Sequence, residues 1–274
     1  MTEPYVPELD IVYPPNPDDH MGDLQVVRDV IVDENYPFLD KSFRGRFGRF
    51  LTYWICFPVA MIVSSIRCGI KTEGRKNFRK HRRLLKDGAM TVSNHVHRWD
   101  MILVLKAIRY RSIYIPVWKE LMNSPDMFFV RGIGGIPIPE SLQAVKNFNK
   151  AFDEVRAKKK WLHAYPESSR FDYYQPIRPF KKGVFTMAYR YNLPIVPMAF
   201  SYRPPAFPYT LLNSFRASKG RRKLPMMTLR IGEPLLFDAS LGRKEAVQKM
   251  RKDCHEAVVR LAGITNNIYP AEGD

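Results

Sequence analysis

Eight consecutive residues, SNHVHRWD (Ser93–Asp100), bring two imidazoles, a guanidinium and a carboxylate together directly after the apolar run 89–92. If the chain leaves a strand there and begins a helix near Trp99, the carboxylate of Asp100 can fold back onto His95. The aspartate would then accept a hydrogen bond from one ring nitrogen and leave the other free to take a proton. The spacing therefore favours a general base that activates a hydroxyl group of the substrate.

Two other interpretations of the same residues stay open at this point. His95, His97 and Asp100 could be part of a metal site, because His-x-His pairs with a carboxylate bind zinc or iron. The motif could also be only the polar start of a helix. The four other histidines of the chain show no recognisable ligand spacing. We therefore expect no metal, and we expect His97 to be exposed or at the helix start.

A second polar cluster follows the apolar segment at 161–165 and reads PESSR (Pro166–Arg170). The guanidinium of Arg170 and the hydroxyls of Ser168 and Ser169 are donors that suit an anionic or phosphate-bearing substrate, and Glu167 lies beside them. Alone, the cluster could be a turn with a surface salt bridge. A third segment, LPIVPM, begins 23 residues later at Leu193.

The elements that must position these motifs alternate between extended and helical segments. Helical patterns cover 75–87, 140–158 with Ser141 as N-cap, 184–191 and 243–261. Short apolar runs that predict strands lie at 89–93, 112–117, 134–138, 161–165, 194–200 and 226–232. Several of these runs lack polar alternation, which is typical of a sheet covered on both faces. The pattern predicts an α/β fold with a mixed, mostly buried sheet flanked by helices.

Residues 50–66 form an uncharged run of 17 residues with basic residues on both sides and Pro58 inside it. A spanning helix usually needs about 20 apolar residues. We therefore expect a broken or paired helix that lies in one leaflet, with a buried core helix as the alternative. Three regions follow: an acidic, proline-rich leader (1–40), a membrane-associating helical segment (41–71) and an α/β domain (72–274).

The charge distribution indicates an anionic partner. Net charge is +17, but ten acidic side chains and one arginine give residues 1–40 a charge of −9, so the other 234 residues carry +26. An anionic membrane surface, an acyl-CoA or an acidic carrier protein would fit this body. The chain lacks a nucleic-acid recognition motif, so we expect no nucleic acid as partner. Only three cysteines occur, without pairing pattern, which fits a reducing compartment.

Together the motifs resemble those of the glycerolipid acyltransferase family, whose best-known members acylate lysophosphatidic acid. Asn94, His95 and Asp100 match its N-H-x4-D motif, Tyr165–Arg170 match F-P-E-G-T-R, and Leu193–Met198 match V-P-I-V-P-V. The resemblance covers about residues 40–235. It implies an O-acyltransferase with His95 as the base and Asp100 as its partner. It also implies a lyso-lipid acceptor, held by Glu167 and Arg170, and a thioester donor, acyl-CoA or acyl carrier protein, without a further cofactor.

Two positions depart from the family pattern. Ser168 stands where glycine is usual, and Glu140 stands where the second motif commonly has an arginine that binds the acceptor phosphate. Either Arg131, Lys181 or Lys182 takes over that task, or the acceptor is another lyso-lipid, such as an aminolipid or glycolipid. The enzyme is expected on the cytoplasmic face of the membrane, monotopic or peripheral. A non-catalytic lipid-binding protein with the same fold is the remaining alternative.

Overall fold

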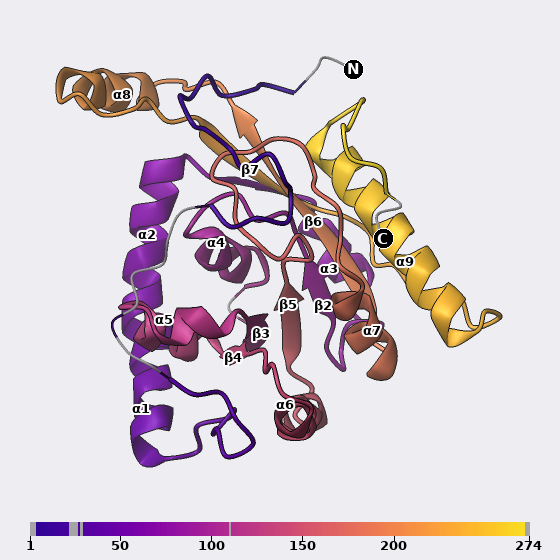
Figure 1. Cartoon of the computed structure of the whole chain (residues 1–274). Coiled ribbons are helices and arrows are strands. Elements are labelled where there is room, and N and C mark those ends of the chain that lie inside the picture. Colours follow the sequence, from indigo (N-terminus) through magenta and orange to yellow (C-terminus); the bar gives the residue numbers. More distant parts are fainter. Residues whose placement is uncertain (1–3, 22–26, 28–29, 110, 272–274) are drawn as a thin grey trace.

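The computed structural model describes the chain except residues 1–3, 22–26, 28–29, 110 and 272–274, and its centre is a seven-stranded sheet (Figure 1). The strands lie in the order β1-β7-β6-β2-β5-β3-β4. Their bounds are β1 Lys71–Glu73, β2 Met90–Val92, β3 Ile113–Val117, β4 Gly135–Pro137, β5 Trp161–Ala164, β6 Ile195–Arg203 and β7 Met226–Ile231. All neighbouring strands are parallel except β6 and β7, which are antiparallel. The predicted mixed sheet is confirmed.

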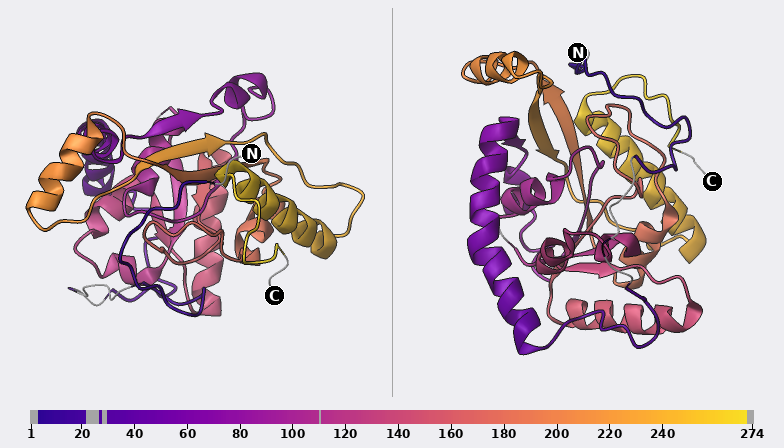
Figure 2. Two further views of the ribbon diagram at one scale, coloured as in Figure 1. Left: turned by 90° about the horizontal axis from the view of Figure 1, so that it is seen from above. Right: turned by 60° about the vertical axis from the view of Figure 1, so that its left-hand side comes forward.

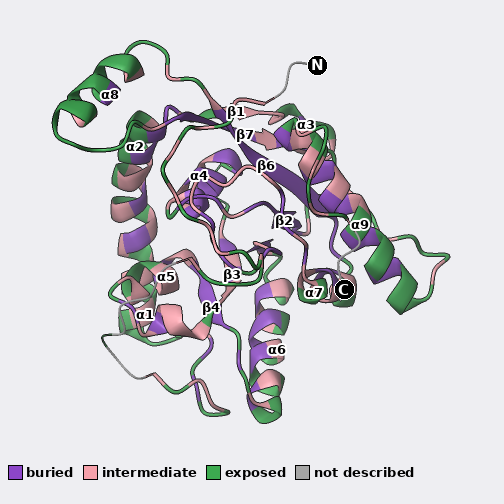
Figure 3. Ribbon diagram, turned by 45° about the horizontal axis from the view of Figure 1, so that its top comes forward, coloured by how far each residue is buried: buried purple, intermediate pink, exposed green. Residues whose placement is uncertain are grey.

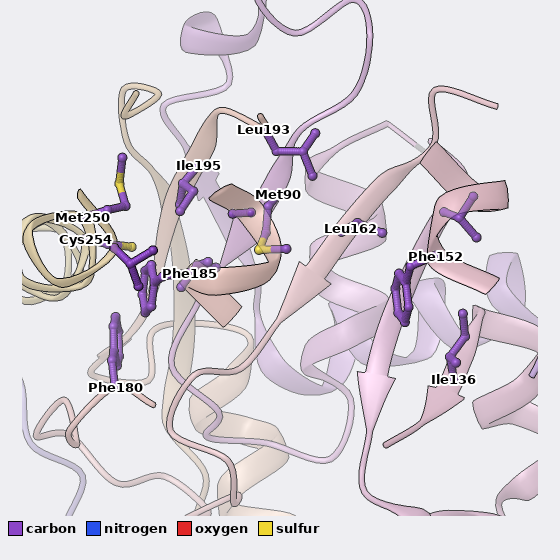
Figure 4. Packing of buried hydrophobic residues seen from close by; sticks show 14 of the residues in the cluster. Met90, Ile136, Phe152, Leu162, Phe180, Phe185, Leu193, Ile195, Met250 and Cys254 are labelled. Atoms are coloured by element: carbon purple, nitrogen blue, oxygen red, sulfur yellow. The ribbon is translucent and has the colours of Figure 1, made fainter. Parts of the chain in front are cut away.

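Helices cover both faces of this sheet (Figure 2). Their bounds are α3 Lys76–Lys80, α4 Asp100–Ala107, α5 Met127–Ile133, α6 Leu142–Ala157, α7 Lys182–Arg190, α8 Tyr209–Ser218 and α9 Arg243–Ala262. One hydrophobic cluster joins α6, α7 and α9 to the sheet (Figure 4), and a second cluster lies under α4. Ile195 belongs to the first cluster and Val196 to the second, as expected because successive side chains of a strand point to opposite faces. The expected two-sided burial of the sheet is therefore present.

An uninterrupted helical segment, Phe43–Cys68, precedes the sheet. It consists of α1 (Phe43–Leu51), a π-helical turn (Thr52–Cys56) and α2 (Phe57–Cys68). The expectation of a broken or paired helix is wrong. Pro58 follows directly after the π-helical turn, and this wider turn gives the ring room within the continuous helix. By length and composition, this helix could cross a membrane.

The six predicted strands are all present, and helices lie where the patterns at 140–158, 184–191 and 243–261 predicted them. Ser141 is the N-cap of α6, with its side chain accepting from the amide of Ala144. The helix predicted over 75–87 ends at Lys80 and continues as turns. Its many arginines and lysines stand three and four residues apart, and such like charges disfavour a longer helix. Strand β1 and helices α5 and α8 were not predicted.

The order of the strands brings the two polar motifs together. β2 and β5 are parallel neighbours, and Val92 at the end of β2 pairs with Ala164 at the end of β5. The Ser93–Asp100 motif follows β2 and the Tyr165–Arg170 motif follows β5, so both leave the sheet at the same edge. In parallel sheets the carboxyl edge of the strands is where ligands usually bind.

Candidate active site

His95 and Asp100 form a hydrogen-bonded pair at this edge of the sheet. Nδ1 of His95 lies 3.0 Å from Oδ2 of Asp100, which agrees with the contact predicted from their spacing. The same oxygen accepts the backbone amides of Val96 (2.7 Å) and His97 (2.9 Å). Asp100 is fully buried, whereas the side chain of His95 retains 22% of its exposure. With Nδ1 donating to the carboxylate, Nε2 is the nitrogen left to accept a proton.

Asn94 fixes the loop that carries this pair. Its side-chain amide donates to the carbonyl of Phe200 (3.1 Å), and its side-chain oxygen accepts the amide of the same residue (2.8 Å). Phe200 lies in β6, the neighbour of β2 on the other side. The loop after β2 is therefore tied to β6 by two buried hydrogen bonds, which keeps His95 at a defined position.

Glu167 and Arg178 hold the same loop from the β5 side. Oε2 of Glu167 accepts the backbone amide of His95 (2.9 Å), and its Oε1 accepts the amide of Arg178 (2.9 Å). The guanidinium of Arg178 lies 3.2 Å from Oε2 of Glu167, and their side chains are only 1% and 2% exposed. Such a buried, fully hydrogen-bonded ion pair has little freedom to move. Arg178 therefore fixes the Glu167 carboxylate, which accepts the backbone amide of His95.

Arg178 is held by further contacts. It donates to Oγ of Ser169 (2.6 Å), to the carbonyl of Ser169 and to the carbonyl of Pro17 in the leader (3.0 Å). Its guanidinium also lies 4.0 Å from the ring centre of Phe171. These contacts pack the leader against the loop that follows the Tyr165–Arg170 motif.

Electrostatics favour a neutral imidazole at His95. Burial, with the positive charges of Arg170 and Arg178 nearby, lowers the pKa of His95 well below its usual 6.5. Burial raises the pKa of Asp100, and His97 and the backbone amides of Val96 and His97 oppose that rise. A histidine that is unprotonated in the resting enzyme is in the form that a general base needs.

Two aromatic side chains complete the surroundings of His95. The ring of Tyr165 stacks on the imidazole with centroids 3.9 Å apart, and His163 meets the other side of Tyr165 edge-on at 4.5 Å. Nδ1 of His163 lies 2.8 Å from Oγ1 of Thr91. The stack restrains rotation of the His95 ring. Burial lowers the pKa of His163, so this histidine is a neutral packing residue.

The structure places the other residues of the Tyr165–Arg170 motif in different surroundings. Ser169 is buried against Arg178, and Ser168 is exposed. Ser168 has φ +67°, in the left-handed region that favours glycine, which gives a physical reason for the glycine usual in the family at this position. Arg170 is half-buried, with Nε 2.8 Å from Oδ1 of Asp172. Arg170 is thus the accessible cation of the motif, whereas Glu167 lies in the interior.

Arg131 and Lys182, the other predicted substrate ligands, lie in other surroundings. Arg131 donates to the hydroxyl of Tyr36 (2.7 Å) and lies 3.8 Å from Asp40, so it contacts the end of the leader. Lys182 is exposed at the first residue of α7. Glu140, which replaces the expected arginine, has an exposed carboxylate 2.6 Å from Nζ of Lys119. The structure brings none of these side chains into contact with His95.

His97 lies at the helix start, as expected, but it is buried rather than exposed. Its Nδ1 accepts the amide of Trp99 (3.1 Å), and its ring packs edge-on against Tyr173. Within the part of the chain that the structure describes, there is no group of three or more His, Cys, Asp or Glu side chains placed to hold a metal ion.

Sequence reasoning missed Arg178 as a site residue. It is a single basic residue in the apolar segment IRPF (Ile177–Phe180), and a basic residue next to three apolar ones is a weak signal for a buried ion pair. The stacking of Tyr165 on His95 was also missed. Both residues act on the position of His95.

Comparisons with known proteins can be set beside this geometry. Residues 69–201 match the family model described as Acyltransferase. The 1-acyl-sn-glycerol-3-phosphate acyltransferase of Saccharomyces cerevisiae is 26% identical over 157 residues, which cover 55% of this chain and 50% of that protein. The chain thus spans about half the length of this curated relative. Among solved structures, the 1-acyl-sn-glycerophosphate (LPA) acyltransferase PlsC of Thermotoga maritima is 18% identical with a TM-score of 0.48, covering 80% of this chain and 89% of that one.

An α/β sheet with a His–Asp pair at the carboxyl ends of its strands has the geometry to activate a hydroxyl group. The family match contains both strands β2 and β5 and the motifs that follow them. Residues 69–201 thus match the acyltransferase family, which supports the family that the motifs resemble.

Proposed function

We propose that this protein transfers an acyl group from a thioester donor to the hydroxyl of a lysophospholipid, with lysophosphatidic acid giving phosphatidic acid as the foremost reaction. The hydrogen bond between Asp100 and Nδ1 of His95 carries this proposal, because it leaves Nε2 of a partly exposed, neutral imidazole as the proton acceptor. The name of the yeast relative supports lysophosphatidic acid as acceptor.

In the proposed reaction the acceptor hydroxyl gives its proton to Nε2 of His95 while its oxygen attacks the thioester carbonyl carbon. Asp100 stabilises the imidazolium that forms. When the carbonyl is restored the carbon–sulfur bond breaks, and the imidazolium returns the proton to the departing thiolate. The donor is acyl-CoA or the thioester of acyl carrier protein, and no acyl-enzyme intermediate is formed.

Arg170 is the proposed ligand of the acceptor's phosphate, because it is the half-buried guanidinium whose charge acts on His95. Exposed Lys182 adds a positive charge at the start of α7, and Arg131 is a more remote contributor. Glu167, with its oxygens committed to His95 and Arg178, is assigned to positioning. Ser169 supports Arg178, and exposed Ser168 borders the same loop.

We further propose that the reaction takes place at the cytoplasmic face of a membrane, with the protein monotopic. One side of Phe43–Cys68 packs against the domain, since α2 buries Phe57 and Thr52 contacts Gly132 of α5. Large apolar side chains on the rest of this helix are exposed: Phe43, Phe47, Phe50, Trp54, Ile55, Val59, Ile62, Val63 and Ile66. A helix held against a domain along its length is better suited to lie in one leaflet than to span both. The free cysteines fit a reducing compartment.

The test is acyl transfer to a panel of lyso-lipids with labelled acyl-CoA and acyl carrier protein donors, read by mass spectrometry. We expect His95→Ala and Asp100→Asn each to lower turnover by about 10²–10⁴-fold without loss of the folded state. His81→Ala, which removes a histidine paired with Glu233, is the matched control and should keep its turnover. Near wild-type turnover in His95→Ala would refute the mechanism, and no transfer to any lyso-lipid by the wild type would favour a non-catalytic lipid-binding protein.

A further inference from the structure

Helix α8 stands out from the body of the protein, on the side where α2 ends (Figures 1 and 3). One face attaches it. Tyr209 donates to the carbonyl of Ser65 in α2 (3.3 Å), and the side chain of Asn213 bonds the main chain of Leu224 (2.9 and 3.0 Å). Asn213 is the one helix residue that is buried. Arg216 bonds the carbonyl of Arg222 in the loop that follows, and the large apolar side chains of the helix remain exposed.

An apolar face of α8 points away from this attachment. Leu211, Leu212 and Phe215 stand at positions i, i+1 and i+4, which share one side of a helix. They are 61%, 44% and 65% exposed, and Phe207 just before the helix is 79% exposed. Thr210 and Ala217 lie on the side of the helix away from this face. Four large apolar side chains exposed together indicate an interaction surface rather than a scatter of single residues.

A strongly basic loop follows this helix. Lys219, Arg221, Arg222 and Lys223 are all exposed. The sequence contains no aspartate or glutamate between Tyr173 and Gly232. Within the described residues, these four cations make no ion pair with a carboxylate. An exposed apolar face beside unpaired positive charges is the composition of a helix that lies at the interface of an anionic membrane.

The position of α8 connects it to the apolar surface of α2. Tyr209 contacts the last turns of α2, and Ile62, Val63 and Ile66 in those turns are exposed. The views of Figures 1 and 2 agree in placing α8 and α2 along the same side of the molecule. The exposed apolar residues of the two helices thus border one another on that side.

We propose that α8 and the loop Lys219–Lys223 form a second membrane-binding element whose partner is a bilayer of anionic phospholipid. The proposal extends the membrane association assigned to Phe43–Cys68 and rests on it. Leu211, Leu212, Phe215 and Phe207 enter the interface, and the basic loop binds the headgroups. With both Phe43–Cys68 and α8 on the bilayer, the domain cannot rotate about Phe43–Cys68. The side from which a lipid reaches the carboxyl edge of the sheet is then fixed.

Vesicle binding of the full chain tests the charge contribution. Arg221→Gln, Arg222→Gln and Lys223→Gln are combined, and the partition onto vesicles of equal parts phosphatidylcholine and phosphatidylglycerol is compared with that onto phosphatidylcholine alone. At about fivefold per charge, we expect the triple variant to bind the anionic vesicles on the order of a hundredfold more weakly. Binding to phosphatidylcholine alone should change little. Lys146→Gln, Lys150→Gln and Lys158→Gln on α6 remove the same charge from exposed positions and serve as control.

A local probe keeps the test decisive if Phe43–Cys68 alone holds the protein on vesicles. An environment-sensitive fluorophore is attached at Phe215→Cys in a Cys56→Ser background, since Cys68 and Cys254 are buried. We expect its emission to shift to the blue on anionic vesicles, whereas the same label at exposed Thr210→Cys, on the side away from the apolar face, should shift much less.

An unchanged emission at position 215 on anionic vesicles would overturn the proposal, as would a triple variant that binds them like the α6 control. A shift produced by acyl carrier protein but not by vesicles would overturn it in favour of a protein-docking surface. Acyl transfer in detergent micelles separates the two hypotheses. If the wild type shows no transfer there but the fluorophore at Phe215→Cys inserts into vesicles, the proposed function fails and the α8 element stands.

Discussion

The buried ion pair of Glu167 and Arg178 gives the sharpest prediction about how the site is held together. Arg178→Met keeps the length and apolar stem of the side chain but removes its ion pair, its bonds to Ser169 and Pro17, and its contact with Phe171. The carboxylate of Glu167 then stays in the interior with the backbone amides of His95 and Arg178 as its donors.

Breaking a buried ion pair by removing one partner costs about 3–5 kcal/mol, because the other charge is left uncompensated. We expect Arg178→Met to lower the free energy of unfolding by that amount at pH 8. Glu167→Gln combined with Arg178→Met removes the titratable carboxyl group, so the stability of this double variant should depend less on pH between 5 and 8 than that of Arg178→Met. Arg190→Met is the matched control. It breaks an exposed pair with Asp153, and such pairs contribute about 0–1 kcal/mol.

The loss should also depend on pH. Burial already raises the pKa of Glu167, and Arg178 opposes that rise, so the pKa of the folded variant lies still higher above the unfolded value of 4.5. A carboxyl group whose folded pKa is raised binds its proton more tightly in the folded state, and stability falls as pH rises through that range. The deficit of Arg178→Met should therefore be smaller at pH 5 than at pH 8.

Chemical denaturation in detergent, followed by circular dichroism at both pH values, measures these differences. The reasoning is refuted if Arg178→Met costs no more than Arg190→Met. It is refuted equally if the double variant with Glu167→Gln keeps the pH dependence of Arg178→Met.

Two further predictions concern residues on either side of His95. Asn94→Ala removes both hydrogen bonds to Phe200 and leaves the buried backbone amide and carbonyl of Phe200 without those partners. We therefore expect the free energy of unfolding to fall by about 2–4 kcal/mol in the same denaturation assay. A variant as stable as the wild type would contradict the anchoring role. Arg170→Gln removes a positive charge that lowers the pKa of His95, so the acid limb of kcat/KM, where the base becomes protonated, should move to higher pH. Arg260→Gln, an exposed arginine of α9, should leave that limb in place, and an unmoved limb in Arg170→Gln would show that its charge does not act on the base.

Local patterns in the sequence were sufficient to predict most strands and the pairing of His95 with Asp100. The strands are short, buried apolar runs, and Asp100 lies five residues after His95 across a turn, so both follow from neighbouring residues. Arg178 could not be predicted in the same way. Its partners include Pro17, 161 residues away, and a contact over that distance depends on how the leader packs on the finished domain.

Helix α8 and the π-helical turn escaped prediction for different reasons. The sequence before α8 reads as a loop because it contains Pro204, Pro205 and Pro208. The helix after them packs only one face on the protein, and its large apolar residues are exposed. At Pro58 the expectation of a break was reasonable from the residue alone. The chain instead keeps its helix because a widened, π-helical turn directly precedes the proline.

The structure also changes how the second polar motif is understood. From sequence, Glu167 and Arg170 were expected to bind the acceptor together. In the structure the two side chains have separated tasks, since Glu167 accepts the backbone amide of His95 while Arg170 remains half-buried at the surface. The motif after β5 therefore sets the position of the base as well as offering a cation to a ligand. The replacement at Glu140 does not touch this arrangement. Glu140 follows β4, which lies beyond β5 and β3 in the sheet, and its carboxylate pairs with Lys119, which follows β3. A change in acceptor preference at that edge would leave the geometry of His95 and Asp100 intact.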